Sequence, residues 1–128
     1  MKESVMLTVS SLLLLLLMLQ AKHLLVDWCW QPPYEWQNKG TYGHFGGIRH
    51  AGKNAIGTGL CLLPFFGVVG ALIGTVLDFV IHYHVDYTKM NVNKANGWTP
   101  ADVPFWHWVG LDQFLHQATY ILIIWLLI

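Results

Sequence analysis

The stretch SSLLLLLLMLQAKHLLVDWCWQ, residues 10–31, begins like a membrane-spanning helix and ends with polar residues that such helices rarely carry. Leu12–Leu17 is a run of six leucines, and the apolar pattern continues beyond it. A bilayer core about 30 Å thick requires about twenty apolar residues to span it. Within the same segment, His23, Asp27 and Gln31 recur at steps of four, which places them on one face of a helix. The stretch therefore predicts a transmembrane helix with a polar face.

The composition of the whole chain also favours a membrane protein. Of its 128 residues, 55% are hydrophobic and 11% are charged, whereas a soluble domain has about 25% charged residues. The formal net charge is zero and there is no run of basic residues, which argues against nucleic acid as a partner. The length leaves room for a single domain over residues 1–128. A basic residue precedes the leucine run, as in a signal peptide, but Leu19 stands where cleavage requires a small residue, so we expect this segment to be retained.

Apolar segments and helix-breaking residues predict an all-α bundle of four transmembrane helices. The first helix should end before Pro32 and Pro33, because proline cannot continue a helix. The second is rich in glycine and should end before Pro64, and the third should end where a polar loop begins at Met90. Thr99 is the expected N-cap of the fourth helix. The predicted helices cover about residues 5–31, 44–63, 65–89 and 100–128.

Positive charges predict how such a bundle is oriented. Four spans place both termini on one side of the membrane and the two longer loops on the other. Lysines and one arginine lie in these loops or beside them, at Lys39, Arg49, Lys53, Lys89 and Lys94, while the opposite side has only Lys2. The positive-inside rule then places the long loops in the cytoplasm. The lipid bilayer is the expected partner. Because four helices form only a thin bundle, a homo-oligomer is a second possible partner.

Histidine and aspartate occur four residues apart more often than chance allows. Five aspartates and seven histidines in this length should give about half of one such pair. The chain contains four, namely His23–Asp27, Asp78–His82, His82–Asp86 and Asp112–His116. Residues at this spacing lie on one helix face, and at about 1.5 Å per residue from the long-loop side every pair falls in the same half of the bilayer. The pattern predicts one shared polar pocket that opens toward the cytoplasm.

The chemistry of these residues favours a divalent metal ion. Isolated charges are costly at this depth, so they must pair, bind an ion or face water. Imidazole and carboxylate are ligands for zinc, manganese and iron. The predicted metal ligands are His23, Asp27, His82, Asp86, Asp112 and His116. The predicted supporting polar residues are Gln31, His50, Asn54, Asp78, Lys89 and Gln113.

The function that follows from a metal site is a hypothesis with two alternatives. A metal ion with an open coordination position can activate water, which would suit a membrane-embedded hydrolase of a phosphorylated or lipid-like substrate. Lysine and arginine at the pocket mouth would then bind phosphate, the candidates being Lys22, Arg49, Lys53 and Lys89. The first alternative is a proton or cation channel or transporter that uses the same residues. The second is a structural or phage accessory membrane protein, in which the pairs only fix helix packing.

Three motifs resemble a family of small bacterial and phage integral membrane proteins, the domain-of-unknown-function 3307 family. They are Lys-His-x-x-x-Asp-x-x-x-Gln at Lys22, His23, Asp27 and Gln31, His-x-x-x-Asp-x-x-Lys at His82, Asp86 and Lys89, and Asp-Gln-x-x-His at Asp112, Gln113 and His116. On the second helix His50 is followed by Asn54, where family members often carry a second histidine. The resemblance covers nearly the whole chain. The resemblance implies a multi-pass membrane protein, which in bacteria would lie in the inner membrane. It implies nothing about a substrate.

Overall fold

A computed structural model describes residues 7–128, and within that range the chain is helical and contains no strand. Its elements are α1 (Val9–His23), the π-helical turn η1 (Leu24–Cys29), the short α2 (Pro33–Trp36), α3 (Phe45–Asn96) and α4 (Val103–Leu127). The predicted all-α class is confirmed. The predicted start of the first helix, near residue 5, lies outside the described residues.

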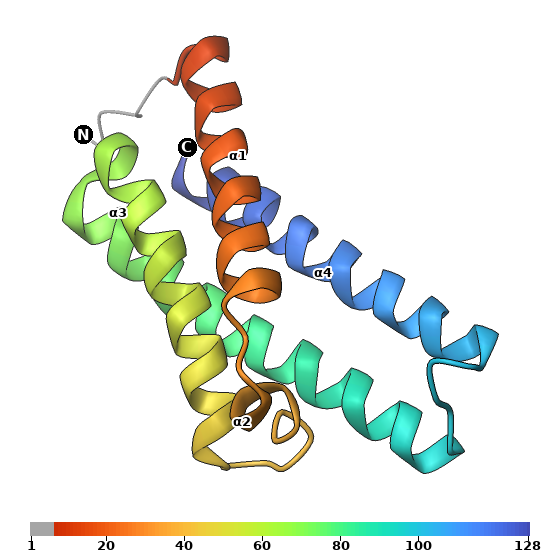
Figure 1. The fold of residues 1–128 in the computed structure, drawn as a ribbon. Helices are drawn as coiled ribbons and strands as arrows, with labels where there is room; N and C mark the ends of the chain where they lie inside the picture. Colours follow the sequence, from red (N-terminus) through yellow and green to blue (C-terminus); the bar gives the residue numbers. More distant parts are fainter. Residues whose placement is uncertain (1–6) are drawn as a thin grey trace.

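The long helix α3 is divided into two arms at Gly67. This residue has φ 66° and ψ −171°, a backbone conformation that essentially only glycine adopts. Residues 45–66 form the first arm and residues 68–96 form the second arm, which returns beside the first (Figure 1). The prediction that a helix ends before Pro64 is wrong, because Pro64 lies inside the first arm. Proline has no N–H to donate to the carbonyl of Leu60, so it costs the last turns of this arm one hydrogen bond without ending the helix.

The predicted loop over residues 90–97 is also wrong, because α3 continues through it to Asn96. Glycine in the left-handed region ends the helix, and the N–H of Trp98 donates to the carbonyl of Asn93 at 2.9 Å, as in a Schellman motif. The Asn91 amide donates to the carbonyl of Gly40 at 2.9 Å. The polar residues of this segment therefore cap the helix or bind the preceding loop, and they do not interrupt it.

The start of α4 differs from the prediction as well. Asp102, and not Thr99, is the residue that precedes the helix. The Asp102 carboxylate accepts hydrogen bonds from the Thr99 N–H at 2.8 Å and from its hydroxyl at 3.0 Å. The threonine and the acid therefore close the turn that comes before α4.

Four helical segments run alternately in opposite directions: α1, the two arms of α3, and α4 (Figure 1). The start of α1, the break in α3 and the C-terminus lie at one end of the molecule, and the loops around α2 and before α4 lie at the other. The hydrophobic core is at the first end, where Leu15, Leu19, Leu62, Tyr120 and Ile123 are almost fully buried together. The buried polar residues lie between this core and the loop end.

Two stretches are long and apolar enough to cross a membrane. They are Val9–Cys29, which combines α1 and η1, and Phe45–Asn96, which is α3 with both its arms. The last helix has 25 residues, but its middle carries Asp112, Gln113 and His116.

Candidate metal centre

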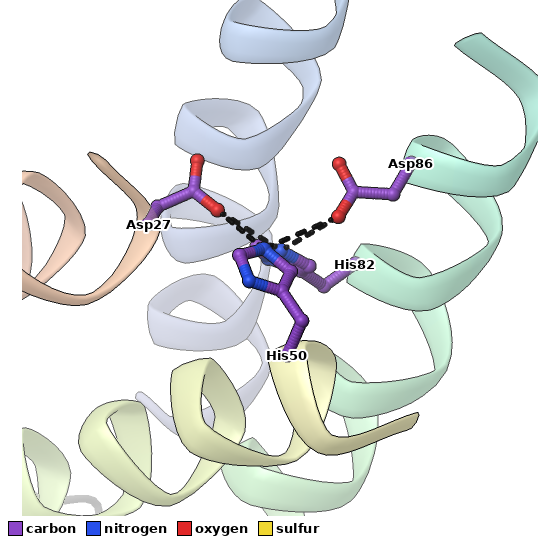
Figure 2. Close-up of side chains that lie close together, drawn as sticks. All are labelled: Asp27, His50, His82 and Asp86. Atoms are coloured by element: carbon purple, nitrogen blue, oxygen red, sulfur yellow. Dashed lines mark hydrogen bonds and ion pairs between the residues drawn. The ribbon is translucent and has the colours of Figure 1, made fainter. Parts of the chain in front are cut away.

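Four buried side chains from three segments form a first donor group. Asp27 comes from η1, His50 from the first arm of α3, and His82 and Asp86 from the second arm. One ligand atom from each residue lies within 4.8 Å of the others. Figure 2 shows the two imidazoles between the two carboxylates, so the four side chains converge on one point. Asp27 reaches this point from a π-helical turn, a distortion that is frequent at functional sites.

The distances within the first donor group match those around a tetrahedral metal ion. The Asp86 Oδ2 atom lies 3.3 Å from Nε2 of His50 and 3.3 Å from Nε2 of His82. The Asp27 Oδ1 atom lies 3.3 Å from Nε2 of His82 and 2.8 Å from Nε2 of His50. Ligands about 2.0–2.1 Å from a tetrahedral ion lie about 3.3 Å from one another. Three of these four distances have that length, and only the shortest is a hydrogen bond.

A second donor group shares Asp86 with the first. It adds Asp112 and His116, both buried and both from α4. The His116 Nε2 atom lies 3.5 Å from Asp86 Oδ1 and 3.4 Å from Asp112 Oδ1. The two groups together bring α4 to the same centre as η1 and both arms of α3.

Several ligand atoms of this centre are buried without a hydrogen-bond partner. Among residues 7–128 this applies to both ring nitrogens of His82 and His116, to both carboxylate oxygens of Asp86, and to Oδ1 of Asp112. Leaving a buried polar atom unpaired costs about 1–3 kcal/mol, and native proteins contain few such atoms. A cation that accepts lone pairs from imidazole and carboxylate would satisfy these atoms, so the donor set fits a divalent metal ion.

Two lysines lie between the centre and the loop end. Nζ of Lys39, a buried residue, is 3.1 Å from Asp86 Oδ2. Nζ of Lys89, which is half-buried, is 2.9 Å from Asp112 Oδ2 and 3.7 Å from Asp86 Oδ1. Both lysines line a cavity of about 450 Å³ whose wall also includes Asp27. The cavity connects the loop end with the first donor group.

Comparison with known proteins assigns the chain to a family. A family model described as "Protein of unknown function (DUF3307)" matches residues 12–128. The chain belongs to this family. No curated protein and no solved structure matches it. The matched range includes every residue of both donor groups.

In this DUF3307 protein a glutamate that the sequence analysis missed lies behind the first donor group. Glu35, in α2, is fully buried, and its Oε2 atom lies 3.5 Å from Nδ1 of His50. Its carboxylate also contacts Nε of Arg49 at 3.0 Å and Nζ of Lys53 at 2.7 Å. Histidines that bind metal commonly present their other ring nitrogen to a carboxylate, which fixes the orientation of the ring. Glu35 is placed to do this for His50, and the two cations hold Glu35.

The structure brings together most of the predicted ligands of the DUF3307 protein, and it adds one. Asp27, His82, Asp86, Asp112 and His116 lie in the donor groups, and so does His50, which was predicted only as a supporting residue. His23 lies outside both groups. Its Nε2 atom is 2.7 Å from the side-chain oxygen of Gln113, and its Nδ1 atom is 3.1 Å from the hydroxyl of Tyr120. The Nε2 atom also lies 3.5 Å from Oδ2 of Asp27, so His23 borders the first donor group without belonging to it.

The other predicted supporting residues surround the centre at different depths. The Asn54 amide donates to the carbonyl of His50 at 3.2 Å and lies 3.5 Å from Asp27. Gln113 also donates to Asp112 at 3.0 Å, and Gln31 lines the cavity.

Asp78 belongs to a separate buried group deeper in the bundle. It accepts a hydrogen bond from Thr58 at 2.5 Å and lies 3.6 Å from Nζ of Lys22, which in turn donates to Tyr120 at 2.7 Å.

Three of the four predicted phosphate-binding cations are engaged elsewhere. Arg49 and Lys53 bind Glu35. Lys22 points into the bundle toward Asp78 and Tyr120. Lys89 remains at the cavity, where Lys39 joins it. Lys39 lies outside the predicted helices, and only the folding of its loop brings it to the cavity. Its place there could therefore not be predicted from the sequence.

Proposed function

We propose that this DUF3307 protein is a multi-pass membrane protein that binds a divalent metal ion at the first donor group, and that it hydrolyses a phosphorylated, lipid-like substrate. The observation that carries the proposal is the convergence of Asp27, His50, His82 and Asp86 in a buried position with metal-like spacing. Zinc, manganese and iron all accept this mixture of imidazole and carboxylate ligands.

The outer surface of the helices supports four membrane spans. Large apolar side chains are exposed along α1, both arms of α3, and α4, as at Leu13, Leu17, Leu60, Val69, Val76, Val80, Phe114, Ile121 and Trp125. A water-soluble protein rarely exposes apolar surface on this scale. In a bilayer the same side chains would face lipid, and the His/Asp centre would face the interior of the bundle, as polar residues in membranes do. The long loops would lie in the cytoplasm, and a homo-oligomer would add a second copy as a partner.

Two cavities support an amphiphilic substrate. The cavity of about 450 Å³ offers Lys39 and Lys89 to an anion and is also lined by tryptophan and phenylalanine rings. A second cavity of about 370 Å³ lies between the second arm of α3 and α4, and half of the residues that line it are aliphatic. Lys89 lines both cavities. A phosphate group in the first cavity and an acyl chain in the second would therefore meet beside Asp112, which also lines the second.

The metal ion would contribute a polarised substrate oxygen or an activated water for hydrolysis of a phosphate ester. The residues of the chain would bind the substrate phosphate and limit the access of water. Lys39 would exchange its contact with Asp86 for the substrate phosphate, because a cation at the first donor group would neutralise that carboxylate, and Lys89 would approach the phosphate from the side of Asp112. The buried walls would limit the access of water to the site.

The packing of the other half of the bundle argues against a proton or cation conduit. A path across the membrane would have to pass the core at Leu15, Leu19, Leu62 and Ile123, whose side chains are almost fully buried against one another. The polar residues of the centre lie on one side of that core. Their position suits a site that opens to one face of the membrane.

Elemental analysis of the purified protein tests the metal site. We expect the wild-type chain to retain a divalent metal through purification and His82→Ala to lose it. His107→Ala is the matched control, because His107 is exposed on α4 and is outside both donor groups. A wild-type protein without metal, even after incubation with zinc, manganese and iron, would reject the proposal. Metal content that is the same in His82→Ala would reject it too.

A further inference from the structure

We infer that the centre holds two divalent metal ions, one at each donor group, and that Asp86 bridges them with its two carboxylate oxygens. This inference rests on the proposed metal site and specifies its nuclearity. The first donor group supplies Asp27, His50, His82 and Asp86, and the second supplies Asp86, Asp112 and His116.

The two oxygens of Asp86 face different ligands. Oδ2 lies 3.3 Å from Nε2 of both His50 and His82, on the side of the first donor group. Oδ1 lies 3.5 Å from Nε2 of His116, on the side of the second. The other charged groups near these oxygens are two lysines, with Nζ of Lys39 3.1 Å from Oδ2 and Nζ of Lys89 3.7 Å from Oδ1. A carboxylate whose oxygens point to two separate sets of nitrogen and oxygen donors has the arrangement of a bridge between two ions.

Two histidine rings set the spacing of the two positions. The rings of His82 and His116 are stacked, with centroids 4.0 Å apart and planes inclined by 20°. Each ring directs Nε2 toward a different oxygen of Asp86. Metal ions in two-metal sites lie about 3.5–4 Å apart, so parallel rings at this separation would each bind one ion of such a pair.

The two positions differ in how completely the protein surrounds them. The first donor group offers four ligands, which is enough to complete a tetrahedral shell. The second offers three, which leaves a coordination position for another ligand. Asp112, one of the three, lines the cavity between the second arm of α3 and α4. The second ion is therefore the one that can accept an oxygen of the substrate or a water molecule, and the first ion holds the bridge in place.

The lysines beside Asp86 and Asp112 are distributed in agreement with two separate metal positions. In the described structure Lys89 lies 2.9 Å from Asp112 and 3.7 Å from Asp86, so its ammonium group occupies the side of the second donor group. Lys39 lies 3.1 Å from Asp86 on the other side. Each lysine thus balances one carboxylate of the centre. Two divalent ions would replace both lysines as counter-charges and would free them toward the cavity that they line.

The experiment loads the full-length protein in detergent with manganese(II) and combines stoichiometry with electron paramagnetic resonance. We expect two manganese ions per chain and a spectrum with exchange coupling between them. Asp112→Asn should bind one ion per chain and give the six-line signal of isolated manganese, because the first donor group is intact. Asp102→Asn is the matched control and should keep two coupled ions, since Asp102 contacts only the turn at Thr99. Circular dichroism verifies that each variant is folded, and His116→Gln serves the same purpose if Asp112→Asn does not fold.

The outcomes separate the inference from the proposed function. One uncoupled ion per wild-type chain would overturn the two-metal centre and leave the single metal site standing. Two ions per chain in Asp112→Asn and in His116→Gln would also overturn it, because the second ion would then lie elsewhere. No bound manganese, zinc or iron at all would overturn the proposed function together with the inference.

Discussion

Glu35 is not part of either donor group, but it is placed to fix the orientation of the His50 ring. Its carboxylate lies 3.5 Å from Nδ1 of His50, whose other nitrogen faces Asp27 and Asp86. Removing the carboxylate would let the imidazole ring rotate and would lower its basicity. Arg49 and Lys53 would meanwhile lose their common partner.

We expect Glu35→Gln to weaken metal binding by about 10- to 100-fold, the usual effect of losing a partner behind a metal ligand. The stoichiometry at saturating metal should not change, because every ligand of the donor groups is retained. A competitive titration with a chelating dye measures the affinity. Asp102→Asn, the same acid-to-amide change in an exposed turn, should leave the affinity as it is. Equal affinities of Glu35→Gln and wild type would show that His50 does not depend on Glu35.

Lys22 is the second residue whose environment allows a specific expectation. It is buried, and it lies 3.6 Å from the buried carboxylate of Asp78 and 2.7 Å from the hydroxyl of Tyr120. Lys22→Met would leave Asp78 buried without a counter-ion, which costs about 3–5 kcal/mol. Thermal unfolding in detergent should show a large loss of stability. Lys94→Met, at an exposed position of α3, should have little effect.

The double variant Lys22→Met with Asp78→Leu completes this test. Replacing both partners of a buried ion pair with apolar residues is often neutral or stabilising, so the second substitution should recover most of the lost stability. Metal content should remain at the wild-type level in both variants, because neither residue belongs to a donor group. A double variant that is less stable than Lys22→Met alone would show that Asp78 has another role.

Sequence spacing could predict much of this site, because histidine and aspartate on one helix face must converge when the helices pack. It found five of the six residues in the donor groups as ligands, and His50 as a supporting residue. It also predicts His23 as a ligand, and that ring lies next to Gln113 and Tyr120, with Nε2 3.5 Å from Oδ2 of Asp27. Glu35 and Lys39 could not be predicted, since they lie between the long helices and only the folding of the loop against α3 brings them to the centre.

At the scale of helices, the number and direction of the segments followed from the apolar pattern, while their boundaries did not. Pro64 predicts the end of the second helix, but the conformation that divides α3 occurs at Gly67. The polar residues at 90–97 predict a loop, but residues 90–96 form the last turns of α3. Both errors have one cause. A helix in this bundle is stabilised by its neighbours, and it therefore continues through residues that would end an isolated helix.

The hairpin formed by the two arms of α3 depends on the backbone conformation of a single residue, Gly67. Its φ of 66° and ψ of −171° are accessible to glycine and strained for alanine, at a cost of about 1–3 kcal/mol. We expect Gly67→Ala to lower the unfolding temperature in detergent, although a Cβ there would meet no atom within 4 Å. Gly110→Ala on α4 is the matched control, because a Cβ there also has open space and the backbone is helical. Equal stability of the two variants would show that the break in α3 needs no glycine.

At the scale of the whole molecule, the arrangement has one polar half and one apolar half. The end with the start of α1, the break in α3 and the C-terminus holds the hydrophobic core. The loop end holds Lys39, Arg49, Lys53, Lys89 and Lys94, and the cavity with the two lysines of the centre is on that side. In a membrane such an asymmetric protein would give its site access to one compartment only, and the positive-inside rule predicts that this compartment is the cytoplasm.

Cysteine accessibility tests this topology in a chain whose two cysteines, Cys29 and Cys61, are first replaced by serine. Single cysteines at Thr41 and Asn96 report on the two loop-end segments, and a cysteine at Ile128 reports on the opposite end; all three positions are exposed. We expect Ile128→Cys to react with a membrane-impermeant maleimide in bacterial spheroplasts. Thr41→Cys and Asn96→Cys should react only after permeabilisation, because both loops should lie in the cytoplasm.

The pattern of labelling distinguishes a wrong orientation from a wrong fold. If Thr41→Cys and Asn96→Cys react in intact spheroplasts while Ile128→Cys is protected, the four spans stand but the centre opens outward, and its substrate must be sought on that side. If Thr41→Cys and Asn96→Cys differ from each other, the two arms of α3 do not both cross the bilayer. The hairpin at Gly67 makes that last result the most informative, because the break there gives α3 two arms and brings the rings of His50 and His82 to within 5.2 Å of each other.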